Sequence, residues 1–410
     1  MANARNPNLP MNLTSLKSPP FRAYISAAFL AINGTWVQRI TLAWMAWEMT
    51  GSASFVGLVA GINFVPAVLS GPFFGVMADR IDLRRAAISA QFAMIAVSVL
   101  MLVLFFAGTL GTALLAGMSL ATGLAASAYT PVRMALITRL APRETLSSVV
   151  VVTSLNFNLS RLIGPAIGGL IIAHWGVGAA LSVVCLAPLP LVFVLWRLPL
   201  AAPRGPARVA LAFATEMRDG FRYAAENTLV REAMWITGLS ALAGRGALEI
   251  LPAIADGGFA RGAVGLGQLS AAAGAGALLS AMLQALGHAP ATEALKVRSI
   301  WAALASCVLV ALLGLSQSWM LSLFTVAGLG FCGTLVGVSV QSGIQLTLPD
   351  ALRGRVMSLW SVVALGATAA GAFMQGALVD IFGLEATLLG VGGAGLAALL
   401  LPRMLAGRAE

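Results

Sequence analysis

The chain has 410 residues, of which 59% are hydrophobic and 10% charged, and its mean hydropathy of +0.91 excludes an ordinary water-soluble domain. Its formal charge of +10 does not indicate nucleic-acid binding, because the 25 basic residues stand singly or in pairs between apolar runs. A helix needs about 20 mostly apolar residues to cross a bilayer, so the length allows about twelve spans.

Apolar stretches separated by turn signals predict twelve transmembrane helices. They lie near residues 22–47, 53–77, 86–107, 112–133, 146–173, 177–197, 231–254, 264–287, 298–315, 318–345, 355–378 and 384–402. The first 20 residues are polar and contain no short apolar run before a small-residue cleavage site, so we expect no removable signal peptide. The expected fold class is an all-α membrane protein.

Basic residues are distributed unequally between the two sides of this arrangement. If the chain starts in the cytoplasm, Arg261 is the only basic residue of the outer connections, which lie near 48–53, 108–112, 174–178, 255–263, 316–318 and 379–384. Arg39, Arg161 and Arg245 lie within spans, and every other basic residue falls on the first side. Because Lys and Arg are enriched in cytoplasmic segments, we expect a multi-pass protein of the bacterial inner membrane with both termini in the cytoplasm.

The polar segment 198–230 divides the predicted spans into two groups of six. A shift of 207 residues aligns glycines of the two groups: Gly164 with Gly371, Gly169 with Gly376 and Gly176 with Gly383. Such a repeat predicts two pseudo-symmetric six-helix bundles, as in transporters that rock two halves about a site near the midplane. The expected domains are a cytoplasmic tail (1–20), a first bundle (21–197), a cytoplasmic linker (198–230), a second bundle (231–402) and a cytoplasmic tail (403–410).

A glycine, an aspartate and three arginines lie between the second and third predicted spans: Gly75, Asp79, Arg80, Arg84 and Arg85. Gly75 allows close helix approach, and Asp79 at a helix end can accept hydrogen bonds from the positive N-terminus of a neighbouring helix. The pattern resembles the loop signature of the major facilitator superfamily, which implies a latch against the start of the eleventh span. The alternative is that the arginines only fix the topology. If the latch operates, Asp79→Asn impairs turnover more than folding.

Small residues gather in the fifth predicted span, whose motif comprises Ser160, Arg161, Gly164, Pro165, Gly168 and Gly169. Ser160, Gly164 and Gly168 form one stripe suited to close helix contact, and Pro165 can bend the helix. The segment resembles the Gly-Pro motif of major facilitator antiporters, with Ser160 in place of the usual glycine. Helix packing common to any polytopic protein is the alternative. Arg161 should face protein or a water-filled cavity, because a charge near the bilayer centre costs about 2.5–3.5 kcal/mol.

Three further segments resemble the enterobactin-exporter and macrolide-efflux branch of the same superfamily: residues 36–39, 217–224 and 348–358. The resemblance extends from about residue 21 to residue 400. It implies the major facilitator fold and the export of amphipathic small molecules, such as drugs or siderophores, by proton antiport. The fourth span departs from the proton-coupled drug antiporters, because it lacks their Arg and Gln and has Leu120 at the Arg position.

Polar and charged residues of the first, fourth, seventh and tenth spans are candidates for a substrate cavity: Asn33, Gln38, Arg39, Tyr129, Arg245, Glu249 and Gln341. By resemblance to the superfamily, these spans line a cavity between the two halves. For the uncharged residues, hydrogen bonding between neighbouring helices is an equal alternative.

Arg39 and Glu249 are the least expected charges in the first and seventh spans. Aligning Gly57 with Gly267 gives an offset of 210, which also relates position 39 to position 249. The two residues are therefore expected at equivalent depths, where an ion pair across the cavity would close the outer gate and break as the halves separate. Glu249 is then the candidate proton-coupling residue. The alternative is a local pair between Glu249 and Arg245, one turn earlier.

The sequence predicts a protein that is not an enzyme. ATP hydrolysis is not expected, because the chain has no Gly-rich nucleotide loop ending in Lys-Ser or Lys-Thr. We expect no cofactor and no metal, because the two histidines and three cysteines are not grouped at ligand spacing. The expected partners of a monomer are an amphipathic substrate, protons and the lipid bilayer, without nucleic acid. Two rival functions stay open: a lipid or lysolipid flippase, and a non-transporting membrane sensor or assembly subunit.

Overall fold

The computed structural model of the protein describes residues 13–78, 81–140, 142–198, 221–286 and 291–406. Side-chain surroundings are described for the same ranges except residues 70–78, 143, 350–351 and 402–406. Within these residues the chain forms helices joined by short connections, and none of them is in a β-strand. The predicted all-α fold class is confirmed.

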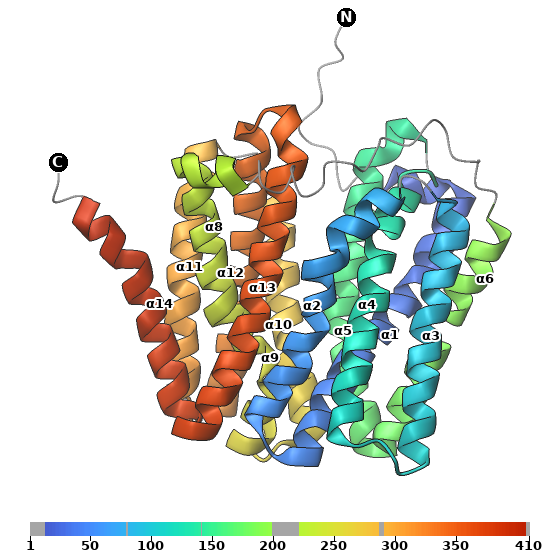
Figure 1. The fold of residues 1–410 in the computed structure, drawn as a ribbon, viewed down its shortest axis with the longest axis horizontal. Helices are drawn as coiled ribbons and strands as arrows, with labels where there is room; N and C mark the ends of the chain where they lie inside the picture. Colours follow the sequence, from blue (N-terminus) through green and yellow to red (C-terminus); the bar gives the residue numbers. More distant parts are fainter. Residues whose placement is uncertain (1–12, 79–80, 141, 199–220, 287–290, 407–410) are drawn as a thin grey trace, which may run out of the picture.

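The helices form two groups that lie side by side (Figure 1). The first group comprises α1 (Pro19–Thr50), α2 (Ala53–Ala78), α3 (Leu83–Phe106), α4 (Thr112–Ile137), α5 (Leu146–Leu186) and α6 (Leu189–Arg197). The second group comprises α8 (Thr228–Ser240), the π-helix η3 (Ala241–Arg245), α9 (Gly246–Glu249), the π-helix η4 (Ala253–Gly258), α10 (Gly262–Leu286), α11 (Thr292–Leu315), α12 (Trp319–Thr347), α13 (Asp350–Phe382) and α14 (Leu384–Ala406).

Twelve passes through the bundle account for these helices. In the part of the chain that the structure describes, eight continuous helical segments are long and apolar enough to cross a membrane. One of them, which joins α5 and α6, turns back at Gly176 and crosses twice. The other passes are α1, α2 and the run from α8 to η4. Gly176 and Gly383, which the repeat aligns, both have φ of 81° at equivalent turns, a conformation that glycine adopts without steric cost.

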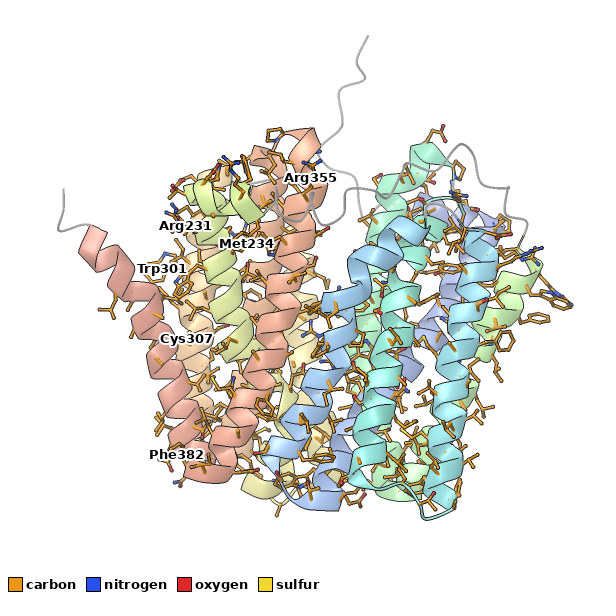
Figure 2. All side chains as sticks on the ribbon, viewed as in Figure 1. Arg231, Met234, Trp301, Cys307, Arg355 and Phe382 are labelled. Carbon is orange, nitrogen blue, oxygen red and sulfur yellow. The ribbon has the colours of Figure 1, made fainter. Side chains whose placement is uncertain are left out.

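The bundle has two distinct ends. The terminal end is where α1 begins and α14 ends, and the far end is where α1 ends and α2 begins. Figure 2 shows Arg231 and Arg355 at the terminal end and Phe382 at the far end. Helices α2 and α13 pack against each other, and Figure 1 shows that they lie closest near the far end and diverge toward the terminal end. The two groups are therefore in closest contact at the far end.

Buried apolar side chains follow the same division. One cluster extends from Val37 in α1 to Leu399 in α14 and so includes both helix groups. A second cluster, from Phe21 to Leu198, lies within the first group toward the terminal end. The first group thus has its own core at the terminal end and shares a core with the second group toward the far end.

The predicted boundaries differ from the observed ones by a few residues. A 3₁₀ helix (Thr14–Lys17) and the start of α1 lie inside the predicted tail 1–20, and another 3₁₀ helix (Arg143–Thr145) precedes α5. Helix α8 begins inside the predicted linker 198–230, and α14 continues into the predicted tail 403–410. Most of that linker lies outside the described residues. The division into domains stays a prediction.

Candidate functional site between the two helix groups

Glycines on four helices bring the two groups into backbone contact. A Cβ added to Gly376 in α13 would lie 2.3 Å from the carbonyl oxygen of Ala53 in α2. At the position that the repeat makes equivalent, a Cβ added to Gly169 in α5 would lie 2.6 Å from the carbonyl oxygen of Ala263 in α10. Any larger residue at these glycines must push the groups apart. The predicted repeat is therefore visible in two matching interfaces, α2 with α13 and α5 with α10.

The small-residue stripe of the fifth span packs against α1. Asn33 donates through Nδ2 to Ser160 Oγ at 3.0 Å. A Cβ added to Gly164 would lie 2.6 Å from the Cβ of Trp36, and one added to Gly168 would also meet α1. In addition, the carbonyl of Pro165 faces α10, on the other side of α5. Helix α5 thus joins α1 of its own group to α10 of the other group.

An ion pair joins the groups between α1 and α9. Arg39 donates to Glu249 Oε1, and the side chains are 38% and 13% exposed. The Arg39 guanidinium also lies 5.5 Å from the ring centroid of Trp36 and 4.9 Å from that of Phe64. A charge without a partner at this depth would be costly, so the pair favours contact between the groups. The structure brings together the two charges whose pairing the repeat predicted.

Two further arginines lie near this ion pair. Arg161 on α5 is half-buried, with its guanidinium 5.9 Å from the Trp36 ring centroid. Arg245 ends the π-helix η3 and faces Gly333 and Gly337 of α12, where an added Cβ would lie 3.9 Å and 3.5 Å from it. Among the described residues, Glu249 pairs with Arg39 and forms no ion pair with Arg245. π-Helical turns occur often at functional sites.

The N-terminus of α2 is capped from the other group. Asp380, near the end of α13, accepts hydrogen bonds from Ser52 Oγ at 2.6 Å, Ala53 N at 2.8 Å and Ser54 N at 3.0 Å. Backbone N–H groups at a helix start have no partner within the helix, and a carboxylate there also complements the helix dipole. Asp380 therefore links the far ends of the two groups.

A second carboxylate at the far end acts differently. Asp256 in η4 accepts a hydrogen bond through Oδ1 from Gly262 N, the first residue of α10, at 3.1 Å. Its other oxygen accepts the indole N–H of Trp47 in α1 at 2.9 Å. Asp256 thus caps a helix of its own group and reaches the other group through one aromatic side chain.

Three predicted cavity residues form none of the contacts between the groups described above. Gln38 is buried inside the first group, where its Nε2 donates to Ser98 Oγ at 3.2 Å and Thr122 Oγ1 at 3.3 Å. Tyr129 packs against the separate core cluster of the first group. Gln341 is half-buried on α12. For Gln38 the geometry favours the alternative of bonding between neighbouring helices.

The loop motif after α2 is described only in part. Three of its residues lie outside the described surroundings: Gly75, Asp79 and Arg80. Asp82 caps α3, accepting backbone hydrogen bonds from Arg84 at 2.9 Å and Arg85 at 3.2 Å. The Arg84 guanidinium donates to the carbonyl of Trp196 at the end of α6. This part of the motif braces the first group at the terminal end, and the latch role of Asp79 stays a prediction.

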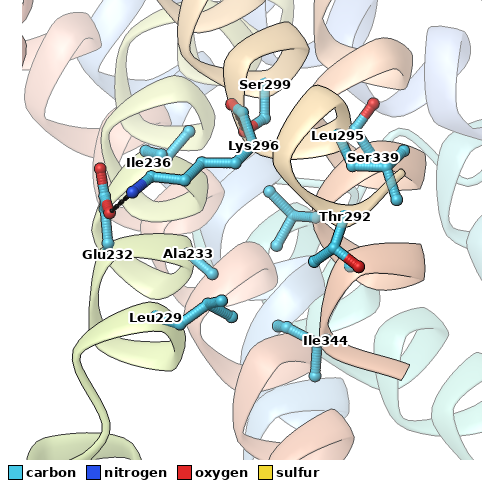
Figure 3. Close-up of a pocket in the computed structure, with 12 residues that line it drawn as sticks. Leu229, Glu232, Ala233, Ile236, Thr292, Leu295, Lys296, Ser299, Ser339 and Ile344 are labelled. Carbon is cyan, nitrogen blue, oxygen red and sulfur yellow. Dashed lines mark hydrogen bonds and ion pairs between the residues drawn. The ribbon is translucent and has the colours of Figure 1, made fainter. Parts of the chain in front are cut away.

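A small pocket lies within the second group near the terminal end, between α8, α11 and α12 (Figure 3). Most of its wall is apolar, with Leu229 and Ile344 among the lining residues. At its edge, Lys296 Nζ lies 2.9 Å from Glu232 Oε2. The pocket contains no predicted site residue and does not lie between the groups.

Asp256, Asp380 and the polar contact of Trp47 were not predicted. Trp47 lies at the end of the first predicted span, where a tryptophan is expected in the headgroup layer and indicates no helix contact. The available signal was weak but present: both aspartates lie at the far ends of the seventh and eleventh spans, close to the start of another span. A carboxylate at that place is suited to cap a helix of a neighbouring hairpin.

Comparison with known proteins decides the family. The profile of the family described as transmembrane secretion effector matches residues 11–408. The chain belongs to this family. Its relatives include the enterobactin exporter EntS of Shigella boydii serotype 4 (strain Sb227), 28% identical over 402 residues that cover 90% of this chain and 87% of the relative. EntS of Escherichia coli O81 (strain ED1a) is 28% identical over 397 residues, with the same coverage.

Solved structures share the fold at low identity. The nucleoside transporter NupG has a TM-score of 0.70 and 12% identity, covering 93% of this chain and 98% of that one. A bacterial homolog of the human lysosomal transporter Spinster, in an inward-facing and unoccupied conformation, has a TM-score of 0.65 and 13% identity, covering 93% and 94%. The protein is therefore a multi-pass membrane transporter with the major facilitator fold, and its family consists of transporters, not enzymes.

Proposed function

We propose that the protein exports amphipathic small molecules, such as drugs or siderophores, across the bacterial inner membrane in exchange for protons. Both termini then lie in the cytoplasm, in agreement with the scarcity of basic residues in the far-end connections. The far end faces outward, and the substrate enters between the groups from the terminal end. The enterobactin exporters among the relatives support a siderophore-like substrate.

The observation that carries this proposal is the ion pair between Arg39 and Glu249, which joins the two groups toward the far end. This ion pair and the helix cap by Asp380 both hold the two groups together at the far end, which supports a state closed on the outer side. Export requires the far ends to separate, and each of these contacts must then break. Alternating access by two rocking halves gives this sequence of states.

Glu249 is the candidate for the proton. Protonation removes the negative charge from the pair with Arg39, which weakens the closure at the far end. Arg39 cannot take this role, because a guanidinium does not release its proton at physiological pH. The proton relay of the fourth span in drug antiporters has no counterpart here, so the coupling depends on this carboxyl group.

The test is a transport assay in proteoliposomes with an imposed pH gradient. Purified protein is reconstituted, and counterflow of a panel of catecholate siderophores, aromatic organic acids and cationic drugs is measured with and without the gradient. We expect counterflow of at least one compound, accelerated by a gradient that is acidic on the far-end side. Glu249→Gln should keep counterflow and lose the response to pH. Movement of fluorescent lysolipid between leaflets with no counterflow of the panel would instead identify a flippase.

A further inference from the structure

Three arginines and one glutamate form a charged cluster where the helix groups meet: Arg39, Arg161, Arg245 and Glu249. The guanidinium groups of Arg39 and Arg161 both lie over the ring of Trp36. Arg245 lies one turn before Glu249 in the same run of helix. Glu249 pairs with Arg39, and among the described ion pairs none involves Arg161 or Arg245. With Glu249 ionised, the cluster carries an excess of two positive charges, and Arg161 and Arg245 form no direct ion pair in the described part of the chain.

The fold itself does not require these two arginines. In the repeat, Arg161 of α5 aligns with Thr368 of α13. The hydroxyl of Thr368 donates to the carbonyl of Ala364 in its own helix at 2.8 Å. The offset of 210 aligns Arg245 with Thr35, whose hydroxyl donates to the carbonyl of Ala31 at 3.1 Å. The related positions hold threonines that are satisfied within their own helices, so the duplicated packing does not account for the two charges.

The offset of 210 is supported by packing in this region. In the first group Gly164 contacts Trp36, and in the second group Gly371 contacts Gly246, where an added Cβ would lie 2.8 Å from the Gly371 carbonyl carbon. The repeat relates position 36 to position 246 and position 164 to position 371. Arg245 is thus compared with its true counterpart.

The surroundings of the arginines combine backbone without side chains and an aromatic face. Gly333 and Gly337 of α12 present no side chain toward Arg245. Trp36 lies beneath both Arg39 and Arg161, with its ring centroid 5.5 Å and 5.9 Å from their guanidinium carbons. A ligand here meets fixed positive charge next to an aromatic ring.

We propose that Arg161 and Arg245 bind the acidic group of the exported molecule, a carboxylate or phosphate attached to an apolar or aromatic body. This inference rests on the proposed function and names its substrate class. Guanidinium groups present paired N–H donors that match the oxygens of these anions, and they stay charged at every physiological pH. The same charges exclude organic cations, because a cation would face two unpaired positive groups in a medium of low dielectric constant.

Binding of matched probes to the purified full-length protein tests the assignment without transport. Equilibrium dialysis in an uncharged detergent compares 1-naphthoate and 1-naphthyl phosphate with 1-naphthamide and 1-naphthylmethylammonium, which share one aromatic body. We expect saturable binding of the two anions at least tenfold tighter than that of the amide or the cation. Arg161→Gln and Arg245→Gln should each weaken anion binding at least tenfold.

Two variants control for misfolding and for sign. Arg22→Gln changes an exposed arginine of α1 and should bind the anions as the unaltered protein does. Glu249→Gln removes the one negative charge of the cluster, so it should bind them severalfold more tightly. Equal binding of the amide or the cation, unchanged binding in both arginine variants with normal melting curves, or no anion binding by the folded protein would overturn the proposal.

The experiment also separates this site from the proposed function. Anion binding with no proton-dependent counterflow would retain the site and remove the antiport mechanism, whereas counterflow without anion binding would remove the site alone. Adding phosphatidylglycerol distinguishes the source of the anion. Displacement of naphthoate by the lipid would assign the site to a lipid headgroup, and undisturbed binding would assign it to a soluble organic anion.

Discussion

The interface of α2 with α13 and the interface of α5 with α10 are two copies of one arrangement with different polar residues. Gly57 meets the carbonyl of Ala372 in the first interface, and Gly267 meets the carbonyl of Pro165 in the second. The repeat relates each residue of one contact to a residue of the other. The backbone packing is thus common to both interfaces and follows from the duplication.

The polar residues break this symmetry. Asp380 caps α2 from the opposite group, while its counterpart on α5 is Ala173, and α10 is instead capped by Asp256 of its own group. Arg39 and Glu249 occupy equivalent positions with opposite charges and so can pair. Residues that form the backbone packing are repeated, whereas the residues to which we assign closure of the far end or binding of the substrate differ between the halves. The differences are therefore the places to test function.

The largest expected effect comes from exchanging the charges at positions 39 and 249. Arg39→Glu and Glu249→Arg should each abolish counterflow in proteoliposomes, because each places two like charges in contact at a site of reduced solvent access. Combining them restores opposite charges and should recover part of the rate. Arg22→Glu, on an exposed face of α1, is the matched control and should transport normally. Absence of any recovery in the double variant, with normal protein abundance, would contradict the gate.

Filling the equivalent glycine contacts should have the next largest effect, and it should be alike in both interfaces. Alanine at Gly376 or Gly169 places a Cβ 2.3 Å or 2.6 Å from a carbonyl oxygen of the other group. The far ends must then move apart, at a cost of about 1–3 kcal/mol for overpacking. Gly390→Ala in α14, with no atom within 4 Å of the added Cβ, should be neutral.

Distance measurements between spin labels at the far end can detect this opening. Thr109→Cys and Ser316→Cys carry the labels in a protein without its three native cysteines, one label on each group. We expect a longer mean distance in both glycine variants and no change for Gly390→Ala. A change in only one interface would show that the two copies do not share the closing role.

The twelve passes and the pairing of Arg39 with Glu249 could be predicted from the sequence. Spans are encoded locally, because each needs a long apolar run whose composition is visible without knowledge of the fold. The ion pair depends on tertiary structure. It could still be predicted, because residues at equivalent positions of the repeat lie at the same depth in the membrane. The repeat also aligns Gly176 with Gly383, and the two glycines have the same φ of 81°.

The rest of the site depends on helix rotation and on which helix ends meet. A span that is apolar on all sides gives no indication of its inward face, so Gln38 could not be assigned between the cavity and the interior of its group. The cap by Asp380 requires that α2 and α13 run antiparallel and in contact, which no pattern within either segment specifies. From the sequence, Asp380 is therefore assigned to the outer connection 379–384 and not to a helix cap.

Removing the cap that α2 receives from the other group should shift the protein toward an open far end. Asp380→Ala deletes the acceptor of three hydrogen bonds, at a cost of about 1–2 kcal/mol for a helix cap, and the label distance should lengthen in a larger fraction of molecules. Asp380→Asn keeps an acceptor oxygen and should lie between. Glu385→Ala, an exposed acidic residue at the same end, is the control. An unchanged distance distribution for Asp380→Ala would leave the cap a feature of helix stability alone.

Trp47 provides the smallest and most specific test of the asymmetry. Trp47→Phe keeps an aromatic ring at the contact and removes only the indole N–H that Asp256 accepts, a loss of about 1 kcal/mol. Because Asp256 still caps α10 through its other oxygen, the protein should keep its melting temperature. The fraction of molecules with an open far end should rise less than in Asp380→Ala. Asp256→Asn provides the counterpart, since it weakens the cap and the contact together and should lower the melting temperature as well. If Trp47→Phe opened the far end as widely as Asp380→Ala, the indirect link through Asp256 would contribute as much to closure as the direct cap.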